Sequence, residues 1–430
     1  MTKLLERLTN VRRDEKGALL WALVYGFCIF LAYYILRPVR DEISSADRGN
    51  LQILWTAVFI VMLIAVPAYS WVVARWPRAK FVPWVNRFFI ACLVGFYIAL
   101  VSLPLGARPW IDRVFYVWAS VFALFVVTVF WGFMADLFTS EQGKRLFGPI
   151  AVGGSLGSII GSMVTAGLVD VLPAFSLLLV ACVPLEVAAQ AARRLQRHSD
   201  RAGSTLRREN APVSGSVWSG IKVVFSSPYL ARIALFIFLM TFASTVLYFQ
   251  QAHLLYDAIS DRAVRTALFA KIDLAVNVIT LVGQGLIVAH VIRRLGMGWS
   301  LALVPIISMF GFVALGIFPT LTVLVVVQVL YRSLRYAVAK PTREVLFTVV
   351  DREEKYKSKA FIDAAVYRGG DLINGWIYAG LAALGMTVGA IALVAAPVAG
   401  LWALIGLQLG RRQEALAATS EGANDDSLST

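Results

Sequence analysis

The feature that most constrains this 430-residue chain is a series of nearly charge-free apolar stretches, each roughly twenty residues long, that recurs from end to end. Wound as an α-helix, such a stretch crosses a hydrocarbon core of about 30 Å. Hydrophobic residues make up 59% of the chain and charged residues only 15%, which is too apolar for a soluble domain. A membrane β-barrel would instead show alternating segments of about ten residues, which we do not find. The sequence therefore predicts an all-α integral membrane protein.

About twelve helical spans are predicted, and turn signals decide where two long apolar stretches divide. Asp170 and Pro173 interrupt one stretch, and Pro319 with Thr320 interrupts the other, which suits tight turns between antiparallel helices. The predicted spans are 18–36, 51–73, 81–105, 114–138, 147–168, 171–191, 229–249, 268–289, 301–317, 321–336, 361–384 and 388–407.

Lysine and arginine are concentrated at the N-terminus, at every second junction between spans and at the C-terminus. Cytoplasmic segments retain such cations, so both termini are predicted to be cytoplasmic. The same distribution explains the net charge of +14, because the basic residues are spread over loops and do not form one face with interleaved aromatic residues. We therefore expect a lipid bilayer, and no nucleic acid, as a partner.

A basic, polar segment close to the midpoint predicts a linker between two halves. The expected organisation is an N-terminal six-helix half (1–192), a cytoplasmic linker (193–227), a C-terminal six-helix half (228–410) and a cytoplasmic tail (411–430). A faint repeat at an offset of 214 residues agrees with this: Phe147, Ala151, Val152, Ile159 and Gly161 match Phe361, Ala365, Val366, Ile373 and Gly375. Chance matching of apolar segments is the alternative. Two pseudo-symmetric halves are the architecture of major facilitator transporters.

The glycine-rich stretch AVGGSLGSIIGS lies inside the fifth predicted span. A phosphate-binding loop would need a preceding strand, so the stretch is not a nucleotide fingerprint. Gly153, Gly157 and Gly161 recur every fourth residue and share one helix face. This spacing favours close packing against a neighbouring helix over direct contact with a ligand.

Cysteine and histidine give no sign of metal or thiol chemistry, since all three cysteines lie in apolar spans and the three histidines are scattered. A Walker motif and clustered catalytic residues are also absent from the sequence. We therefore expect no metal, no cofactor and no enzymatic activity.

Polar residues form a stripe along the eighth predicted span. Asp273, Asn277, Thr280 and Gln284 fall within an arc of about 60° at 100° per residue. Burying such groups in hydrocarbon costs several kcal/mol unless they face a partner or water. The stripe is either a hydrogen-bonded seam between helices or the lining of a cavity.

The tenth and eleventh predicted spans also carry charges. Arg332 and Arg335 lie one turn apart in the tenth, where they either face a cavity or extend to the cytoplasmic surface. Asp363 and Asp371 lie in the eleventh, flanked by Arg368. These three either contact a solute, or Asp363 lies at the cytoplasmic interface and Arg368 pairs with Asp371 for structure.

The first predicted span ends in YYILRPVRDE, which places Arg37 and Arg40 one turn apart. Planar guanidinium groups suit phosphate oxygens, so the pair is either an anion site at a cavity mouth or part of an outer-loop ion-pair cluster. Asp136, near the inner end of the fourth span, is expected to pair with Lys144 or Arg145 across the next loop, as a gating or a structural ion pair.

Three blocks of the sequence, in both halves, resemble a known family. YYILRPVRDE, FWGFMADLFTSEQGKRLFGPI and KPTREVLFTVVDREEKYKSKAFIDAAVYRGGD are similar to the ATP/ADP exchangers of plastids and intracellular bacteria, and more narrowly to their bacterial relatives in the major facilitator superfamily. The resemblance implies exchange of nucleotides, with Arg40 at the position of a lysine in the exchangers and Lys357 or Lys359 matching another. The fifth span lacks the acidic residue of the exchangers, and Asp273 is at best a substitute for the one in their eighth span.

The sequence thus predicts a secondary transporter of a small, anionic or phosphorylated solute in a bacterial inner membrane, working by alternating access. A non-transporting membrane scaffold or sensor with the same fold is the alternative. A monomer is compatible with the sequence, which does not set the oligomeric state. The expected substrate contacts are Arg37, Arg40, Asp273, Asn277, Gln284, Arg332, Arg335, Asp363, Arg368 and Asp371, and the expected gating residues are Asp136, Lys144 and Arg145.

Overall fold

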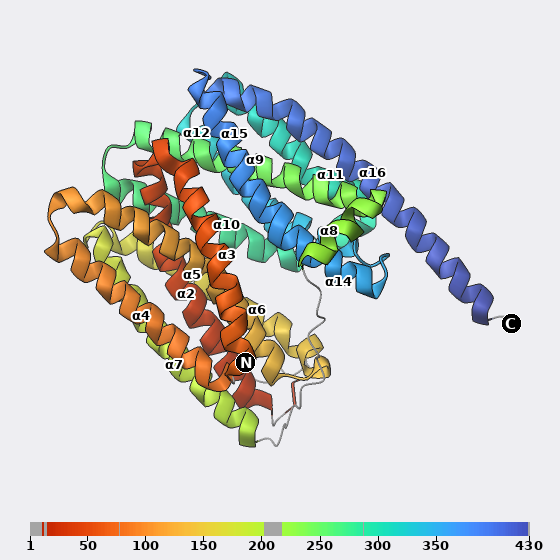
Figure 1. Cartoon of the computed structure of the whole chain (residues 1–430), viewed down its shortest axis with the longest axis horizontal. Helices are drawn as coiled ribbons and strands as arrows, with labels where there is room; N and C mark the ends of the chain where they lie inside the picture. The colour runs from red at the N-terminus through yellow and green to blue at the C-terminus, as the bar shows by residue number, and fades with distance from the viewer. Residues whose placement is uncertain (1–10, 13–14, 77, 202–216, 287, 429–430) are drawn as a thin grey trace. The chain divides into compact units, whose positions relative to one another are not determined.

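The computed structural model describes residues 11–12, 15–76, 78–201, 217–286 and 288–428 (Figure 1). Within these residues the regular structure is helical, with no strand. Eleven helices of this described part are long and apolar enough to cross a membrane. The predicted all-α membrane fold is therefore confirmed at this level.

The helices follow the predicted spans closely. The N-terminal part of the chain contains α2 (Lys16–Ala46), α3 (Leu51–Arg75), α4 (Arg78–Ser102), α5 (Arg108–Leu137), α6 (Ser140–Leu168) and α7 (Leu177–Arg201). The C-terminal part contains α8 (Val217–Ser226), α9 (Pro228–Ala258), α10 (Arg262–Leu286), α11 (Val288–Ile317), α12 (Leu321–Leu334), α13 (Lys340–Val345), α14 (Arg352–Phe361), α15 (Tyr367–Ala383) and α16 (Val388–Leu428). Two π-helical turns, η5 (Arg335–Ala339) and η6 (Ile362–Val366), join α12 to α13 and α14 to α15. The turns expected at Pro173 and at Thr320 lie where the sequence placed them.

Several helices extend beyond their predicted spans, because hydropathy alone set the predicted boundaries. The first span was expected to end at residue 36, but α2 continues to Ala46 through Pro38 and the charged residues that follow. The tenth was expected to end at residue 336, but the apolar segment continues to Val345. Charged side chains lower the hydropathy of a segment, yet a helix continues through them when their partners compensate their burial.

The predicted eleventh span, 361–384, is helical but is not among the eleven helices that meet the length and hydropathy criteria. Its charged side chains, Asp363, Arg368 and Asp371, dilute its apolar character. The π-helical turn η6 also divides it from α14.

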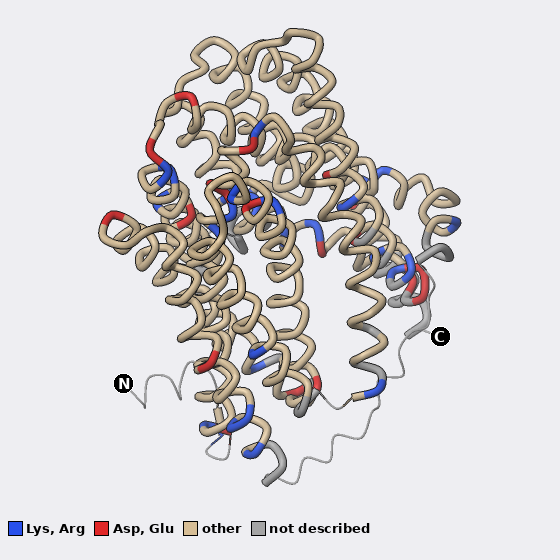
Figure 2. The backbone as a smooth tube through the Cα atoms, turned by 60° about the vertical axis from the view of Figure 1, so that its left-hand side comes forward, with Lys and Arg blue, Asp and Glu red and all other residues tan. Residues whose placement is uncertain are grey.

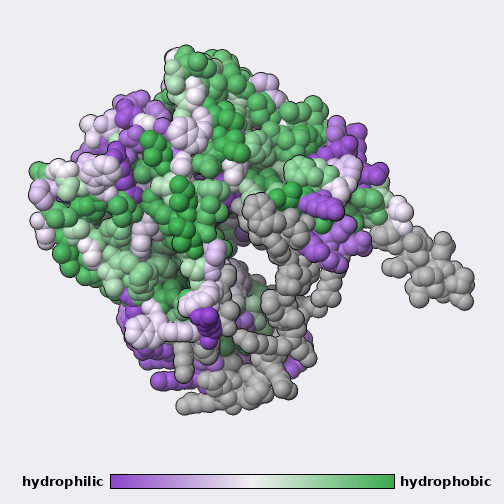
Figure 3. Space-filling model, in the orientation of Figure 1, coloured by the Kyte–Doolittle hydropathy of each residue, from purple (hydrophilic) through white to green (hydrophobic). Residues whose placement is uncertain are grey.

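Hydrophobic side chains cover broad areas of the face shown in Figure 3, and charged residues are confined to short stretches of the tube in Figure 2. On α3 and α4 these outward side chains include Leu63, Ile64 and Phe88, each more than half exposed. Such exposure would be costly in water and is the expected surface of a protein solvated by lipid.

The chain forms two compact units whose boundaries differ from a simple division at the midpoint. The first unit is Met1–Asp47, Thr56–Ala211 and Ile259–Asn277, and the second is Arg48–Trp55, Pro212–Ala258 and Val278–Thr430. The larger part of α10 thus belongs to the first unit, and its end belongs to the second. Of the predicted linker, residues 202–216 lie outside the described residues.

Helix packing follows the same scheme inside each unit. In the first, α2 packs against α5, α6 and α7, and α4 packs against α5 and α7. In the second, α9 packs against α12, α15 and α16, and α11 packs against α12 and α16. Each contact in one unit has its counterpart six spans later, as expected for a duplicated helical bundle.

The glycine stripe of α6 packs directly on the backbone of α2. A Cβ atom added at Gly153 would lie 3.2 Å from the carbonyl oxygen of Leu23, and one at Gly161 would lie 2.6 Å from that of Leu31. At Gly157 it would overlap the carbonyl of Phe27. The predicted packing role is therefore confirmed, because only glycine lets the two backbones approach this closely.

We predict that Gly157→Ala destabilises the protein by about 1–3 kcal/mol, because the added methyl group must push α6 away from α2. Gly167→Ala in the same helix is the matched control, since a Cβ there has no neighbour within 4 Å. Thermal unfolding of the purified protein in detergent measures both variants. Equal midpoints would contradict the packing role.

Candidate functional site

In the first unit, α2, α5 and α10 bring eight charged side chains together. We call this group the α2–α10 ion-pair cluster. Its members are Arg37, Arg40, Asp41, Glu42, Asp112, Arg262, Arg265 and Asp273. All eight residues lie within helices and none lies in a loop.

Two predicted substrate residues, Arg37 and Asp273, meet in this cluster. Arg37 Nε lies 3.4 Å from Asp273 Oδ2 and 3.5 Å from Asp41 Oδ2. Arg40 donates two hydrogen bonds to Asp41 Oδ1, at 2.6 and 3.0 Å. Asp273 is only 1% exposed, so its charge depends on these partners.

Glu42 is the second centre of the cluster and is likewise 1% exposed. Its carboxylate accepts hydrogen bonds from Arg262 Nε at 2.5 Å and from Arg265 at 2.7 Å. Arg262 also pairs with Asp112 of α5 at 2.9 Å. These bonds attach the first turn of α10 to α2 and α5.

The site residues predicted from the sequence do not include Glu42, Asp112, Arg262 or Arg265. The two arginines lie before residue 268, where the apolar stretch begins, and so were counted outside the span. The signal that could have identified these two arginines is their spacing, because residues three apart at the start of a helix lie on one face.

In the second unit, α12, η5 and α15 form an arginine–tyrosine cluster: Arg335, Arg368, Asp371, Tyr331, Tyr336 and Tyr367. The guanidinium of Arg335 donates a hydrogen bond to the hydroxyl of Tyr367. It also lies 5.8–5.9 Å from the ring centroids of all three tyrosines.

Asp371 is the carboxylate of this cluster, and Arg368 and Arg335 are the two cations that act on it electrostatically. Arg332 lies one turn before Arg335 and is buried. Apart from Asp371, helices α12 and α15 contain no acidic residue. The second unit therefore places more positive than negative charge among these helices.

Both π-helical turns meet at this cluster. Arg335 is the first residue of η5, and Tyr367 immediately follows η6. A π-helical turn breaks the regular backbone hydrogen bonding of an α-helix and is frequent at functional sites. The Arg335–Tyr367 contact thus joins two helices at the point where each is least regular.

The polar stripe of α10 is divided between the two units. Asp273 and Asn277 belong to the first, whereas Thr280 and Gln284 belong to the second. The amide nitrogen of Asn277 and the hydroxyl of Thr280 are buried without a hydrogen-bond partner among the described residues. Gln284 is exposed and donates to the Tyr336 carbonyl oxygen at 3.3 Å.

Asp363 lies in a different group of charges. It is exposed and pairs with Arg343 of α13 at 3.4 Å. Lys359, one of the lysines implied by the family resemblance, pairs with Glu344, and the other, Lys357, pairs with Glu353. Asp363 thus belongs to a group of charges separate from that of Asp371.

Arg145, one of the predicted gating residues, pairs with Glu15 at 2.8 Å. Asp136 is exposed, and the side chain of Lys144 lies outside the described residues. Glu15 is buried and also accepts a hydrogen bond from Gln142 at 3.2 Å. The hydrogen bonds from Arg145 hold the pKa of Glu15 below its usual value of 4.5, against the burial that would raise it.

Among the residues that the structure describes, no group of three or more His, Cys, Asp and Glu side chains is arranged to hold a metal ion.

The fold is similar to that of several solved transporters. A bacterial homologue of the iron transporter ferroportin, in its inward-facing state, has a TM-score of 0.65 at 14% identity, covering 93% of this chain and 98% of that chain. The POT family transporter PepTSo has a TM-score of 0.64 at 12% identity, with coverages of 92% and 98%. The nucleoside transporter NupG has a TM-score of 0.60 at 13% identity, with coverages of 93% and 99%. At these identities the similarity establishes the fold.

A comparison with curated proteins finds no match. The sequence profile of the TLC ATP/ADP transporter family matches residues 102–412, which is more than half of the chain.

We predict that Glu42→Gln destabilises the protein by about 3 kcal/mol, because it leaves Arg262 and Arg265 short of a buried negative partner. Hydrogen exchange should also become faster in the first turns of α10. Glu186→Gln is the control: its partner Arg87 is 36% exposed and Glu186 is 42% exposed, so its loss costs little. Similar unfolding midpoints for the two variants would contradict this role of Glu42.

A second prediction concerns pH. Because the folded-state pKa of Glu15 is lowered, its contribution to stability is fully present above pH 4.5 and is lost as pH falls through the folded-state pKa. Glu15→Gln should therefore weaken the decline of the unfolding midpoint in acid. Glu141→Gln, whose pair with Arg12 is exposed on both sides, should leave the decline unchanged. An identical acid decline in wild type and Glu15→Gln would refute the assignment.

Proposed function

The chain belongs to the TLC ATP/ADP transporter family, and from this premise we propose that it is a secondary transporter of a small anionic or phosphorylated solute. Two of the three sequence blocks that resembled this family, FWGFMADLFTSEQGKRLFGPI and KPTREVLFTVVDREEKYKSKAFIDAAVYRGGD, lie within the matched residues, and the protein is a membrane transporter. Nucleotide exchange is the most specific form of the proposal. It rests on the family and on the cations described above.

The arginine–tyrosine cluster contains more cations than carboxylates, and this excess is the main support for an anionic solute. Two arginines, Arg335 and Arg368, act on the one carboxylate of Asp371 there. A desolvated positive charge that exceeds its counter-charge favours an anionic ligand. A planar guanidinium presents paired donors that match phosphate oxygens.

The α2–α10 ion-pair cluster supports a different role. Its four arginines face four carboxylates. Arg37 and Arg40 can therefore bind an anionic solute only if that solute displaces one of these carboxylates. We propose that Arg335 and Arg368 make the main contacts with the solute. Arg37, Arg40 and Asp273 then control the position of α10.

The buried hydroxyl of Thr280, which belongs to the second unit, adds to this proposal. Buried polar groups in folded proteins almost always have a partner, which is protein, ordered water or ligand. Since this hydroxyl has no hydrogen-bond partner among the described residues, the part of α10 that belongs to the second unit suits contact with water or a polar solute.

We further propose twelve spans in two pseudo-symmetric six-helix halves, alternating access, and a location in a bacterial inner membrane with both termini cytoplasmic. The matching helix contacts of the two units support the duplication. The helical segment 361–384 supplies the twelfth span, because a helix with a charged inner face can cross the bilayer when that face is buried in protein.

A membrane scaffold or sensor that retains the fold is the second candidate. The balanced charges of the α2–α10 ion-pair cluster favour it, because polar side chains that pair with one another need no solute. The cation excess of the second unit favours transport. The two candidates therefore predict different roles for Arg335, which contacts the solute in a transporter and is only structural in a scaffold.

We predict that purified wild-type protein in proteoliposomes catalyses counterflow of a labelled nucleotide or phosphorylated metabolite. Arg335→Gln should reduce uptake about tenfold or more, because a charge-assisted contact with the solute is lost. Arg411→Ala, an exposed arginine of α16, is the control and should leave uptake unchanged.

Arg40→Ala and Asp273→Asn test the first unit in the same assay. Both should slow counterflow: Asp273→Asn removes the charge through which α10 pairs with Arg37, and Arg40→Ala removes a partner of Asp41, which shares Arg37 with Asp273. The absence of counterflow with any tested anion in the wild-type protein would favour the scaffold. Uptake that is unchanged by Arg335→Gln would remove that residue from the site.

A further inference from the structure

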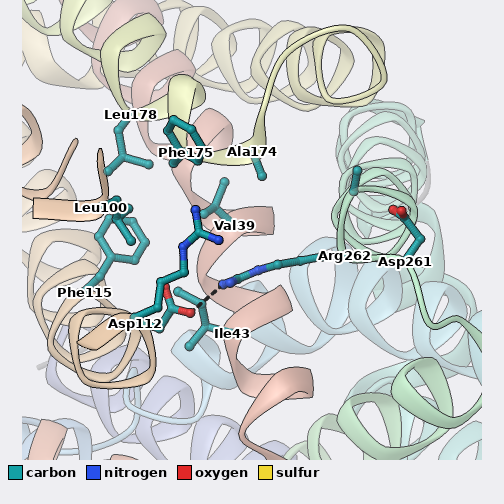
Figure 4. Close-up of a pocket in the computed structure, with 12 residues that line it drawn as sticks. Val39, Ile43, Leu100, Asp112, Phe115, Ala174, Phe175, Leu178, Asp261 and Arg262 are labelled. Carbon is teal, nitrogen blue, oxygen red and sulfur yellow. Dashed lines mark ion pairs between the residues drawn. The ribbon is translucent and has the colours of Figure 1, made fainter. Parts of the chain in front are cut away.

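A cavity of about 290 Å³ lies inside the first unit, between α2, α4, α5, α7 and the start of α10 (Figure 4). Most of its wall is apolar. The apolar side chains that line it are Val39, Ile43, Leu100, Phe115, Phe175 and Leu178. Its volume is close to the lower end of the range for ligand pockets, about 300–1,000 Å³. None of the residues proposed to contact the solute lines it.

The charged residues that line the cavity differ in whether they are available to bind a ligand. Arg262 and Asp112 face each other across it and form an ion pair at 2.9 Å (Figure 4). Asp261 accepts a hydrogen bond from the Val264 amide at 2.9 Å, at the start of α10, and is exposed. Asp112 thus already has a cationic partner, and Asp261 has a hydrogen-bond donor and is in contact with solvent.

Arg108 differs from these residues. Within the described part of the chain it has no carboxylate partner, and its guanidinium lies 5.9 Å from the ring centroid of Phe175. It is half-buried and sits at the first residue of α5. The cavity therefore combines an apolar wall with one cation that can accept an anionic group.

Exposed side chains close in sequence to the lining residues indicate the surroundings from which such a ligand would enter. The turns before α5 and before α7 expose Leu105 and Val171, each 78% exposed, and Trp110 in the first turn of α5 is 67% exposed. The guanidinium of Arg113 stacks 4.9 Å from the Trp110 ring centroid. Exposed tryptophan and arginine beside apolar side chains are typical of the boundary between lipid headgroups and acyl chains.

We propose that this cavity binds an anionic phospholipid of the surrounding bilayer. Arg108 holds the phosphate through its paired N–H donors, and part of an acyl chain lies along Leu100, Phe175 and Leu178. The lipid occupies a site formed by one unit alone, including the first turn of α10. A lipid bound only to the folded unit stabilises it by mass action.

The test uses full-length protein, delipidated in detergent, to which phosphatidylglycerol or phosphatidylcholine is added. Binding is followed by native mass spectrometry and by the unfolding midpoint. Phosphatidylglycerol should bind more tightly and raise the midpoint more. Arg108→Ala should weaken its binding about tenfold, as expected for the loss of one charge-assisted contact, and Arg108→Lys should weaken it less.

Two further variants separate the cavity from the interface in general. Leu178→Trp fills the cavity and should reduce binding of phosphatidylglycerol even though Arg108 is intact. Arg75→Ala removes another arginine that stacks on an exposed tryptophan, Trp71, but does not line the cavity, and should have no effect.

Three results would overturn the proposal: unchanged binding by Arg108→Ala, equal binding of phosphatidylcholine, or equal stabilisation by glycerol 3-phosphate, which has the anionic group without the chains. The last result would indicate a site for a soluble anion. Failure of the transport assay would not affect this test, because native mass spectrometry and the unfolding midpoint measure lipid binding without transport.

Discussion

The structure depends on how charged side chains are compensated inside apolar helices. An isolated charge in such an environment is costly, so its position is set by its partner. Glu42 is the strongest example, since it is almost completely buried and accepts bonds from Arg262 and Arg265. These bonds attach the larger part of α10 to the first unit, although α10 follows the first half of the chain in sequence.

The backbone imposes a second constraint, which the glycines of α6 satisfy. Helices in lipid gain little from hydrophobic burial against each other, and they associate by close packing. Gly153, Gly157 and Gly161 bring α6 against the carbonyl groups of α2, while Thr165 continues the same face with a hydrogen bond to the Ile35 carbonyl oxygen at 3.2 Å. The stripe thus makes the α2–α6 pair a firm support for the charged end of α2.

The two units use arginine differently, and this difference underlies the proposed function. In the first unit every arginine of the cluster faces a carboxylate, which favours a structural or switching role. In the second, two arginines act on one carboxylate, and one of them, Arg335, lies beside three tyrosine rings at two π-helical turns. An irregular helix with unbalanced charge is suited to a ligand that supplies the missing negative charge.

The sequence by itself determined the membrane class, the position of nearly every helix, the glycine packing face and the family resemblance. These follow from local quantities: hydropathy over about twenty residues, turn residues, and spacing along one helix. The tertiary structure alone decided which charges are neutralised. Arg37 pairs with Asp273, and Glu42 with Arg262, over separations of more than two hundred residues. Sequence spacing carries no information about such partners, because burial and pairing arise only when distant helices pack. For the same reason the sequence could place Asp371 and Asp363 in one span but could not show that they belong to different groups of charges.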